Sequence, residues 1–170
     1  MQRFGQQLRC MVYGVWCMVL TMLLCSCEGT TFTSSVPTYP LRVVINMDLG
    51  QFVHFQNKTL GDYIEVHDDG FHYHDQVVLP LGTNACGYGG VVCYVSVNGY
   101  DAYDMACPHC AKQRICSPCT IDGMYAECPV CGEQYDLASG TAAPQKGLIR
   151  ETLRRLKVIQ SGNTLTITQQ

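Results

Sequence analysis

The sequence predicts an all-β protein built mainly from antiparallel strands. Three observations lead to this prediction. Short segments rich in β-branched residues recur from Leu41 onward, hairpin-type turns separate several of them, and the 16 glycines come with no long stretch of helical periodicity. With 170 residues, the chain has a length suited to one domain.

The first 26 residues are expected to be a signal peptide and not part of this domain. Arg3 and Arg9 make a basic start, and the apolar run "MVYGVWCMVLTMLL" that follows is too short to span a bilayer comfortably. The end of the segment, "LCSC", resembles a bacterial lipobox, which implies cleavage before Cys27 and lipidation of the Cys27 thiol. The protein is then expected in the bacterial cell envelope, anchored by its lipid at the outer membrane or the periplasmic face.

The charge of the mature chain excludes one class of partner. Loss of residues 1–26 would remove two positive charges and change the net charge from −3 to −5. An acidic protein lacks the basic surface that attracts nucleic acids, so we expect no nucleic-acid partner. The one basic cluster, "RETLRRLK" at Arg150–Lys157, alternates with apolar residues and is expected on the wet face of a strand.

The rest of the chain is expected to be a tether followed by strands. Residues 27–40 are rich in Thr, Ser and Pro and predict a flexible tether, and residues 41–170 predict the β domain. Strands are expected in "LRVVINMD", "DYIEVHD", "GVVCYVSVNG", "LRRLKVIQ" and "NTLTIT". Asn98-Gly99 and Ser161–Asn163 are typical hairpin turns.

Cysteine is the most informative residue of the chain. After loss of the signal and lipidation, eight of the twelve cysteines remain, and six of them lie with one histidine in a metal-binding subregion at about 103–137. They form three C-x-x-C pairs, namely Cys107/Cys110, Cys116/Cys119 and Cys128/Cys131. Two such turns facing each other make a tetrahedral sulfur site for zinc or iron, and "CPHC" with "CPVCG" looks like the two knuckles of a zinc ribbon or rubredoxin.

The surrounding residues resemble a Rieske iron–sulfur domain. "CPH" fits its first ligand loop, and "CPVCGEQYD" fits its second except that Cys131 stands where histidine is expected. "YDLASG", "GLIRETLRRLKV", "SGNTLTI" and the upstream "GGVVCYVSVNGYDAYDMACPH" extend the likeness over Gly89–Thr168. This resemblance implies a Rieske-like antiparallel β-sandwich with a two-loop metal-binding tip and a 2Fe–2S cluster. Lys112 and Val130 occupy the places of the loop disulfide that many Rieske proteins have.

Two sets of ligands remain open. The resemblance implies Cys107, His109, Cys128 and Cys131, with Cys110 as the alternative to His109. Parity favours Cys110, because four cysteine ligands leave an even set for possible disulfides, namely Cys86, Cys93, Cys116 and Cys119. Exchange of one neutral imidazole for a thiolate adds negative charge and should lower the potential below that of a Rieske centre.

Two further motifs are expected to be structural. "CSPC", Cys116–Cys119, could be a thiol–disulfide redox pair, but a loop disulfide or an extra ligand pair is favoured. "EVHDDGFHYHD" could chelate a metal through His72 and His74, with His67, Asp68, Asp69 and Asp75 nearby, but a polar hairpin around Asp69-Gly70 is favoured.

The sequence therefore predicts a membrane-anchored module that transfers electrons or senses redox state, exchanges electrons with another redox protein, and has no substrate site of its own. The alternative is a structural or interaction lipoprotein of the same fold, with zinc or disulfides at the cysteine loops.

Overall fold

A computed structural model describes residues 33–73, 76–79, 85–147 and 150–170. The chain divides into two compact units, Met1–Thr31 and Phe32–Gln170, and the described residues all belong to the second. The expected signal peptide and Cys27 lie outside the described residues, as do His74 and Asp75. Among the described residues, no helix is both long enough and apolar enough to cross a membrane.

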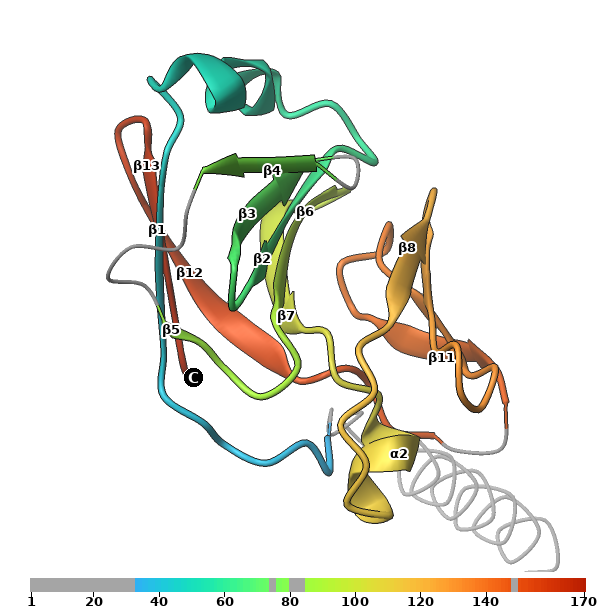
Figure 1. Cartoon of the computed structure of the whole chain (residues 1–170). Helices are drawn as coiled ribbons and strands as arrows, with labels where there is room; N and C mark the ends of the chain where they lie inside the picture. Colours follow the sequence, from blue (N-terminus) through green and yellow to red (C-terminus); the bar gives the residue numbers. More distant parts are fainter. Residues whose placement is uncertain (1–32, 74–75, 80–84, 148–149) are drawn as a thin grey trace, which may run out of the picture. The chain divides into compact units, whose positions relative to one another are not determined.

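The predicted all-β antiparallel class is confirmed. The larger sheet has nine strands in the order β4-β3-β2-β6-β7-β12-β13-β1-β5 and curls into a half-barrel (Figure 1). Its strands are β1 (Leu41–Asn46), β2 (Tyr63–His67), β3 (Gly70–Tyr73), β4 (Gln76–Leu79), β5 (Ala85–Cys86), β6 (Val91–Ser96), β7 (Gly99–Asp104), β12 (Arg155–Ser161) and β13 (Thr164–Thr168). Every pairing between these strands is antiparallel.

The smaller sheet has four short strands in the order β11-β10-β9-β8. They are β8 (Thr120–Asp122), β9 (Tyr125–Glu127), β10 (Gln134–Asp136) and β11 (Ala143–Lys146). Two helices complete the described elements, the 3₁₀ helix η1 (Gly50–Asn57) and the short helix α2 (Pro108–Lys112). The sequence did not predict either helix or any strand of the smaller sheet, because strands of three or four residues are too short to show alternation and helices of five and eight residues too short to show a helical period.

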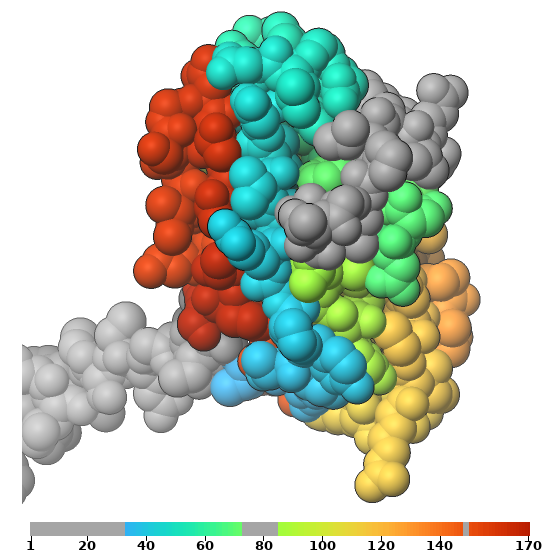
Figure 2. All heavy atoms as spheres, turned by 60° about the vertical axis from the view of Figure 1, so that its left-hand side comes forward, coloured from blue at the N-terminus to red at the C-terminus, as the bar shows by residue number. Residues whose placement is uncertain are grey.

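The predicted hairpins form. Strands β6 and β7 pair around Val97-Asn98, with Ser96 opposite Gly99, so the turn lies one residue before the predicted Asn98-Gly99; Gly99, which opens β7, has a positive φ of 101°. Strands β12 and β13 pair around Gly162, whose φ is 57°. Strand β1 pairs with β13, so strands from distant parts of the sequence lie side by side, cyan beside red in Figure 2.

Strand β6 is buried on both faces, which explains its nearly continuous apolar sequence. Val91, Cys93 and Val95 pack into the half-barrel core, whereas Val92 and Tyr94 pack into a second core shared with the four-stranded sheet. The Tyr94 hydroxyl donates a hydrogen bond to the carbonyl of Gly123 at 3.1 Å, in the turn between β8 and β9. The two sheets are thus joined through the two faces of one strand.

Part of the segment 33–40, which the sequence predicts to be a tether, contacts the β domain. Val36 is 2% exposed and packs with Ala106 and Ala111, and the backbone N–H of Ser35 donates to the Glu151 carboxylate at 3.0 Å. Arg154 binds both the Val36 carbonyl and the Thr38 hydroxyl. These contacts hold part of the segment against the domain and offset the entropy lost on ordering it.

Candidate metal centre

The first half of the centre is the turn that opens helix α2. Cys107 is the N-cap residue of this helix, and Pro108, which has no N–H to leave unsatisfied, occupies its first turn. The helix turns Cys110 toward the same side as Cys107, and both side chains are buried, with 0% and 2% exposure. The buried Asp104 holds the approach to this turn, because its carboxylate accepts hydrogen bonds from the backbone N–H groups of Gly89 and Ala106.

The second half is the turn between β9 and β10, which carries Cys128 and Cys131. The N–H of Gly132 donates to the Cys128 carbonyl, and the N–H of Cys128 donates to the Glu133 carbonyl, each at 2.9 Å. Gly132 has a φ of 71°, a left-handed conformation that glycine adopts without steric cost. The chain therefore folds back sharply enough to direct both thiols to one side.

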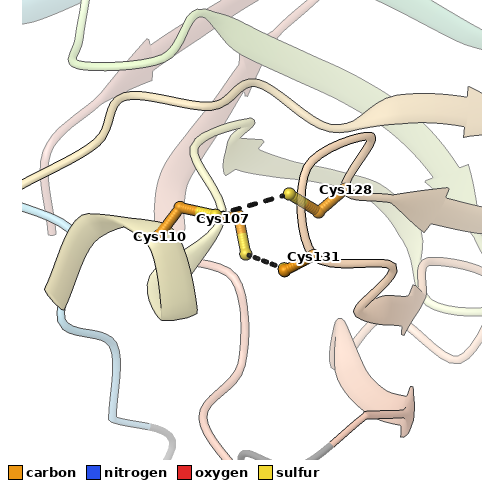
Figure 3. A group of neighbouring side chains, drawn as sticks. All are labelled: Cys107, Cys110, Cys128 and Cys131. Carbon is orange, nitrogen blue, oxygen red and sulfur yellow. Dashed lines mark hydrogen bonds between the residues drawn. The ribbon is translucent and has the colours of Figure 1, made fainter. Parts of the chain in front are cut away.

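The two turns face each other and bring four sulfurs together (Figure 3). The Sγ atoms of Cys107, Cys110, Cys128 and Cys131 all lie within 4.8 Å of one another. Cys107 Sγ lies 3.6 Å from Cys131 Sγ, and Cys110 Sγ lies 3.7 Å from Cys128 Sγ. These contacts are far longer than the roughly 2.05 Å of a disulfide bond, so the four thiols are free to bind a common ion.

His109 lies beside this group and not within it. Its Nδ1 is 3.3 Å from Oε1 of the buried Glu133, and its side chain is 24% exposed. Of the two ligand sets that the sequence leaves open, the structure brings together the one that contains Cys110.

Hydrogen-bond donors surround two of the four sulfurs. The Tyr135 hydroxyl lies 3.4 Å from Cys107 Sγ, and the Ser117 hydroxyl lies 3.3 Å from Cys128 Sγ. Tyr135 belongs to the "CPVCGEQYD" stretch that resembles the second Rieske loop, whereas nothing in the sequence indicated Ser117. Ser117 is brought in by the antiparallel bridge between Ala106 and Pro118, next to which the Cys107 N–H donates to the Ser117 carbonyl.

The environments of the four thiols differ. A hydrogen bond from the Cys119 thiol, with others from Tyr135 and the Cys110 N–H, lowers the pKa of Cys107 to about 4 against the cost of burial. Burial raises the pKa of Cys110, and burial raises the pKa of Cys131 to about 11. At neutral pH the Cys107 thiolate therefore lies beside the protonated thiols of Cys110 and Cys131, and a cation that binds there must displace their protons.

The four cysteines considered for disulfides are free in the structure. Cys86 donates to the Asp68 carboxylate at 2.9 Å, and Cys93 is fully buried in the half-barrel core. Cys116 is exposed and lies 3.3 Å from the Tyr88 carbonyl, whereas Cys119 is buried against Cys107. No expected disulfide is formed among them.

The histidines of the "EVHDDGFHYHD" motif do not converge on a metal site within the described residues. His67 bonds to Glu65 at 3.2 Å and His72 bonds to Asp69 at 2.8 Å, so each histidine has its own acidic partner. The four-cysteine group is the one set of three or more potential ligand atoms that converges in the described part of the chain.

No family model matches the chain, and no curated protein matches it. Solved structures align with the chain, and the two described next have TM-scores of 0.43 and 0.40. Scores this low do not show a family. A chain from a complex of reduced oxygenase and oxidised ferredoxin in carbazole 1,9a-dioxygenase has a TM-score of 0.43 and 15% identity, over 76% of this chain and 94% of that chain. The ferredoxin of carbazole 1,9a-dioxygenase from Nocardioides aromaticivorans has a TM-score of 0.40 and 12% identity, over 79% and 100% of the two chains.

Proposed function

We propose that the protein is a one-electron carrier whose redox centre is iron bound by the thiolates of Cys107, Cys110, Cys128 and Cys131. The observation that carries this proposal is the convergence of four sulfurs from two separate turns within 4.8 Å. Four thiolates suit iron and zinc above the harder metals, and iron would supply the one-electron chemistry that zinc lacks.

The protein's own part is to bury the centre and to set its potential. Three of the four sulfurs belong to buried residues, and the hydroxyls of Tyr135 and Ser117 are placed to donate to Cys107 and Cys128. Donors to a thiolate stabilise the more negative, reduced state and therefore raise the potential.

One edge of the centre is open to a partner. Cys131 is exposed, and Val130, its neighbour in the sequence, is 64% exposed. Electron exchange with another redox protein belongs at this edge, because Cys131 brings the centre to the surface. The same exposure suits a centre that senses the redox state of its surroundings.

The test is to load the metal-free protein with ferrous iron under anaerobic conditions and to titrate it electrochemically. A coloured protein with a reversible one-electron wave supports the proposal, and the Cys128→Ser variant should lack both. An iron-loaded protein that shows no reversible wave contradicts electron transfer.

A second candidate is a structural zinc site, and the small size of the four-stranded sheet favours it. Its strands have three or four residues, and a metal that links the two turns would supply stability that so few residues lack. Zinc in the isolated protein that stays bound when ferrous iron is offered under reducing conditions would favour this function.

The membrane anchor is a separate proposal that rests on the "LCSC" motif alone. Lipidation of Cys27 would hold the domain in the bacterial cell envelope. Metabolic labelling with a palmitate analogue should tag the wild-type protein and spare Cys27→Ala, and equal labelling of both would contradict the anchor.

A further inference from the structure

We propose that the four-cysteine group binds one metal ion and not the two-iron cluster that the Rieske resemblance implies. This inference rests on the proposed metal centre and concerns how many ions that centre takes.

The separation of the sulfurs matches a single tetrahedral ion. Four metal–sulfur bonds of about 2.3 Å in tetrahedral directions place each pair of sulfurs about 3.8 Å apart. Cys107 and Cys131 are separated by 3.6 Å, and Cys110 and Cys128 by 3.7 Å. Because the remaining separations are at most 4.8 Å, one ion reaches all four sulfurs with small side-chain adjustments.

A two-iron cluster needs a wider arrangement of ligands. Each iron takes two protein ligands, and two bridging sulfides lie between the irons, so sulfurs on different irons stand farther apart than sulfurs on the same iron. If the close pairs Cys107/Cys131 and Cys110/Cys128 each bound one iron, every distance between the pairs would have to span that core. None of these distances exceeds 4.8 Å.

The packing around the sulfurs also opposes a larger core. Tyr135, which is 0% exposed, contacts Cys107, and Ser117, which is 5% exposed, contacts Cys128. The buried Cys119 thiol lies against Cys107 from the other strand of the Ala106–Pro118 bridge. Room for two irons and two sulfides would require these buried groups to move together, whereas a single ion needs only small adjustments of the cysteine side chains.

A second consequence concerns His109. The Rieske pattern would require it to bind the outer iron, but its Nδ1 is directed to the Glu133 carboxylate. With one ion and four thiolates the coordination is complete, so His109 is a neighbour of the centre and not a ligand. Replacement of His109 should therefore leave the metal bound.

The test is anaerobic reconstitution with excess ferrous iron and sulfide, followed by counts of iron and acid-labile sulfide per chain. We expect one iron and no bound sulfide, with the electron paramagnetic resonance spectrum of isolated ferric iron after oxidation. A cobalt(II) titration should likewise end at one ion per chain with the absorption bands of a four-thiolate site. Two irons and two sulfides per chain would overturn the inference.

Three variants complete the design. His109→Ala should keep the full metal content, Cys110→Ser should lose most of it, and Cys93→Ala controls for removal of a buried thiol outside the centre. Loss of metal from His109→Ala would also overturn the inference. One iron per chain without a reversible wave would support the single-ion inference and contradict the proposed electron transfer. The two proposals can therefore fail independently.

Discussion

The two sheets of the domain are stabilised in different ways. The half-barrel core is formed mainly by aliphatic and aromatic side chains on strands that are mostly four to seven residues long, among them Ile45, Phe71 and Ile167. The second core, beneath the four-stranded sheet, contains four buried cysteines and three tyrosines, and the strands of that sheet have only three or four residues each. We expect burial of apolar surface to be sufficient to hold the first, whereas the proposed ion would link the turns of the second and stabilise it.

The comparison shows how one strand can serve two purposes. Strand β6 presents Cys93 and Val95 to the half-barrel core and Tyr94 to the cysteine-rich core. The half-barrel thus supplies a stable platform, and the small sheet adds the second turn of the metal centre. Loss of the metal should therefore loosen the small sheet before it affects the platform.

The largest effect is expected from removal of a ligand. Cys128→Ser should abolish metal binding, and the bound metal is worth about 10 kcal/mol or more in small metal-dependent folds. Hydrogen–deuterium exchange should then show loss of protection at β9 and β10, with β6 and β7 still protected. Cys93→Ala is the matched control and should keep both the metal and the protection, and a uniform loss over both sheets would contradict the comparison.

The next effect belongs to the half-barrel core. Ile45 is 0% exposed, so Ile45→Ala should reduce the free energy of unfolding by about 2–5 kcal/mol through lost burial and a cavity. Denaturant unfolding measures this loss. The metal content of the folded variant should equal that of the wild type, and a reduced metal content would show that the two regions are not independent.

A smaller effect is expected at the hydroxyl that contacts Cys107. Tyr135→Phe removes a donor to a ligand sulfur and should lower the midpoint potential by roughly tens of millivolts, since about 59 mV corresponds to a tenfold change for one electron. Spectroelectrochemical titration measures the shift. Tyr94→Phe is the matched control, because its hydroxyl bonds to the Gly123 carbonyl and not to a sulfur. An equal shift of the midpoint potential in both variants would contradict the claim that the Tyr135 hydroxyl acts through its contact with Cys107.

The smallest effect lies on the half-barrel, away from the centre. A hydrogen bond to Glu65, opposed by burial and aided by the charges of Glu65, Asp69 and Asp68, raises the pKa of His67 above 6.5. Protonation then favours the folded state, so this contribution is present below pH 6.5 and is lost as the pH rises through the folded pKa.

His67→Gln should accordingly reduce the free energy of unfolding more at pH 5.5 than at pH 8.5, by about 1 kcal/mol or less. The neighbouring His72 ring, 4.8 Å away, is a competing cation when protonated, and its own partner is Asp69. Denaturant titrations of both proteins at the two pH values measure the difference. A larger effect at pH 8.5 would contradict the assigned cause.

The sequence allowed the half-barrel to be predicted better than the small sheet. Strands such as β1 and β13 alternate apolar and polar residues over five or six positions, and turns such as Asn98-Gly99 have a strong local preference. Strands β8 to β10 have three residues each, too few to show a period, and their pairing depends on the turns that carry the ligands. Burial of Val36 by Ala106 and Ala111 depends on contacts between distant segments, which composition does not reveal.

The sequence indicated which region carries the cysteine group, but it left open whether His109 or Cys110 belongs to the group. The C-x-x-C spacing indicated Cys110 and the Rieske likeness indicated His109, and spacing alone does not decide between two residues that are adjacent in sequence. The helical turn at Pro108–Lys112 separates them in space, with Cys110 directed toward Cys128 and His109 toward Glu133.

X-ray absorption at the edge of the bound metal tests the ligand set most directly. We predict four sulfur neighbours at about 2.3 Å, no nitrogen neighbour and no second metal. A spectrum that requires an imidazole nitrogen, or a second iron close to the first, would contradict a centre built from Cys107, Cys110, Cys128 and Cys131 around one ion.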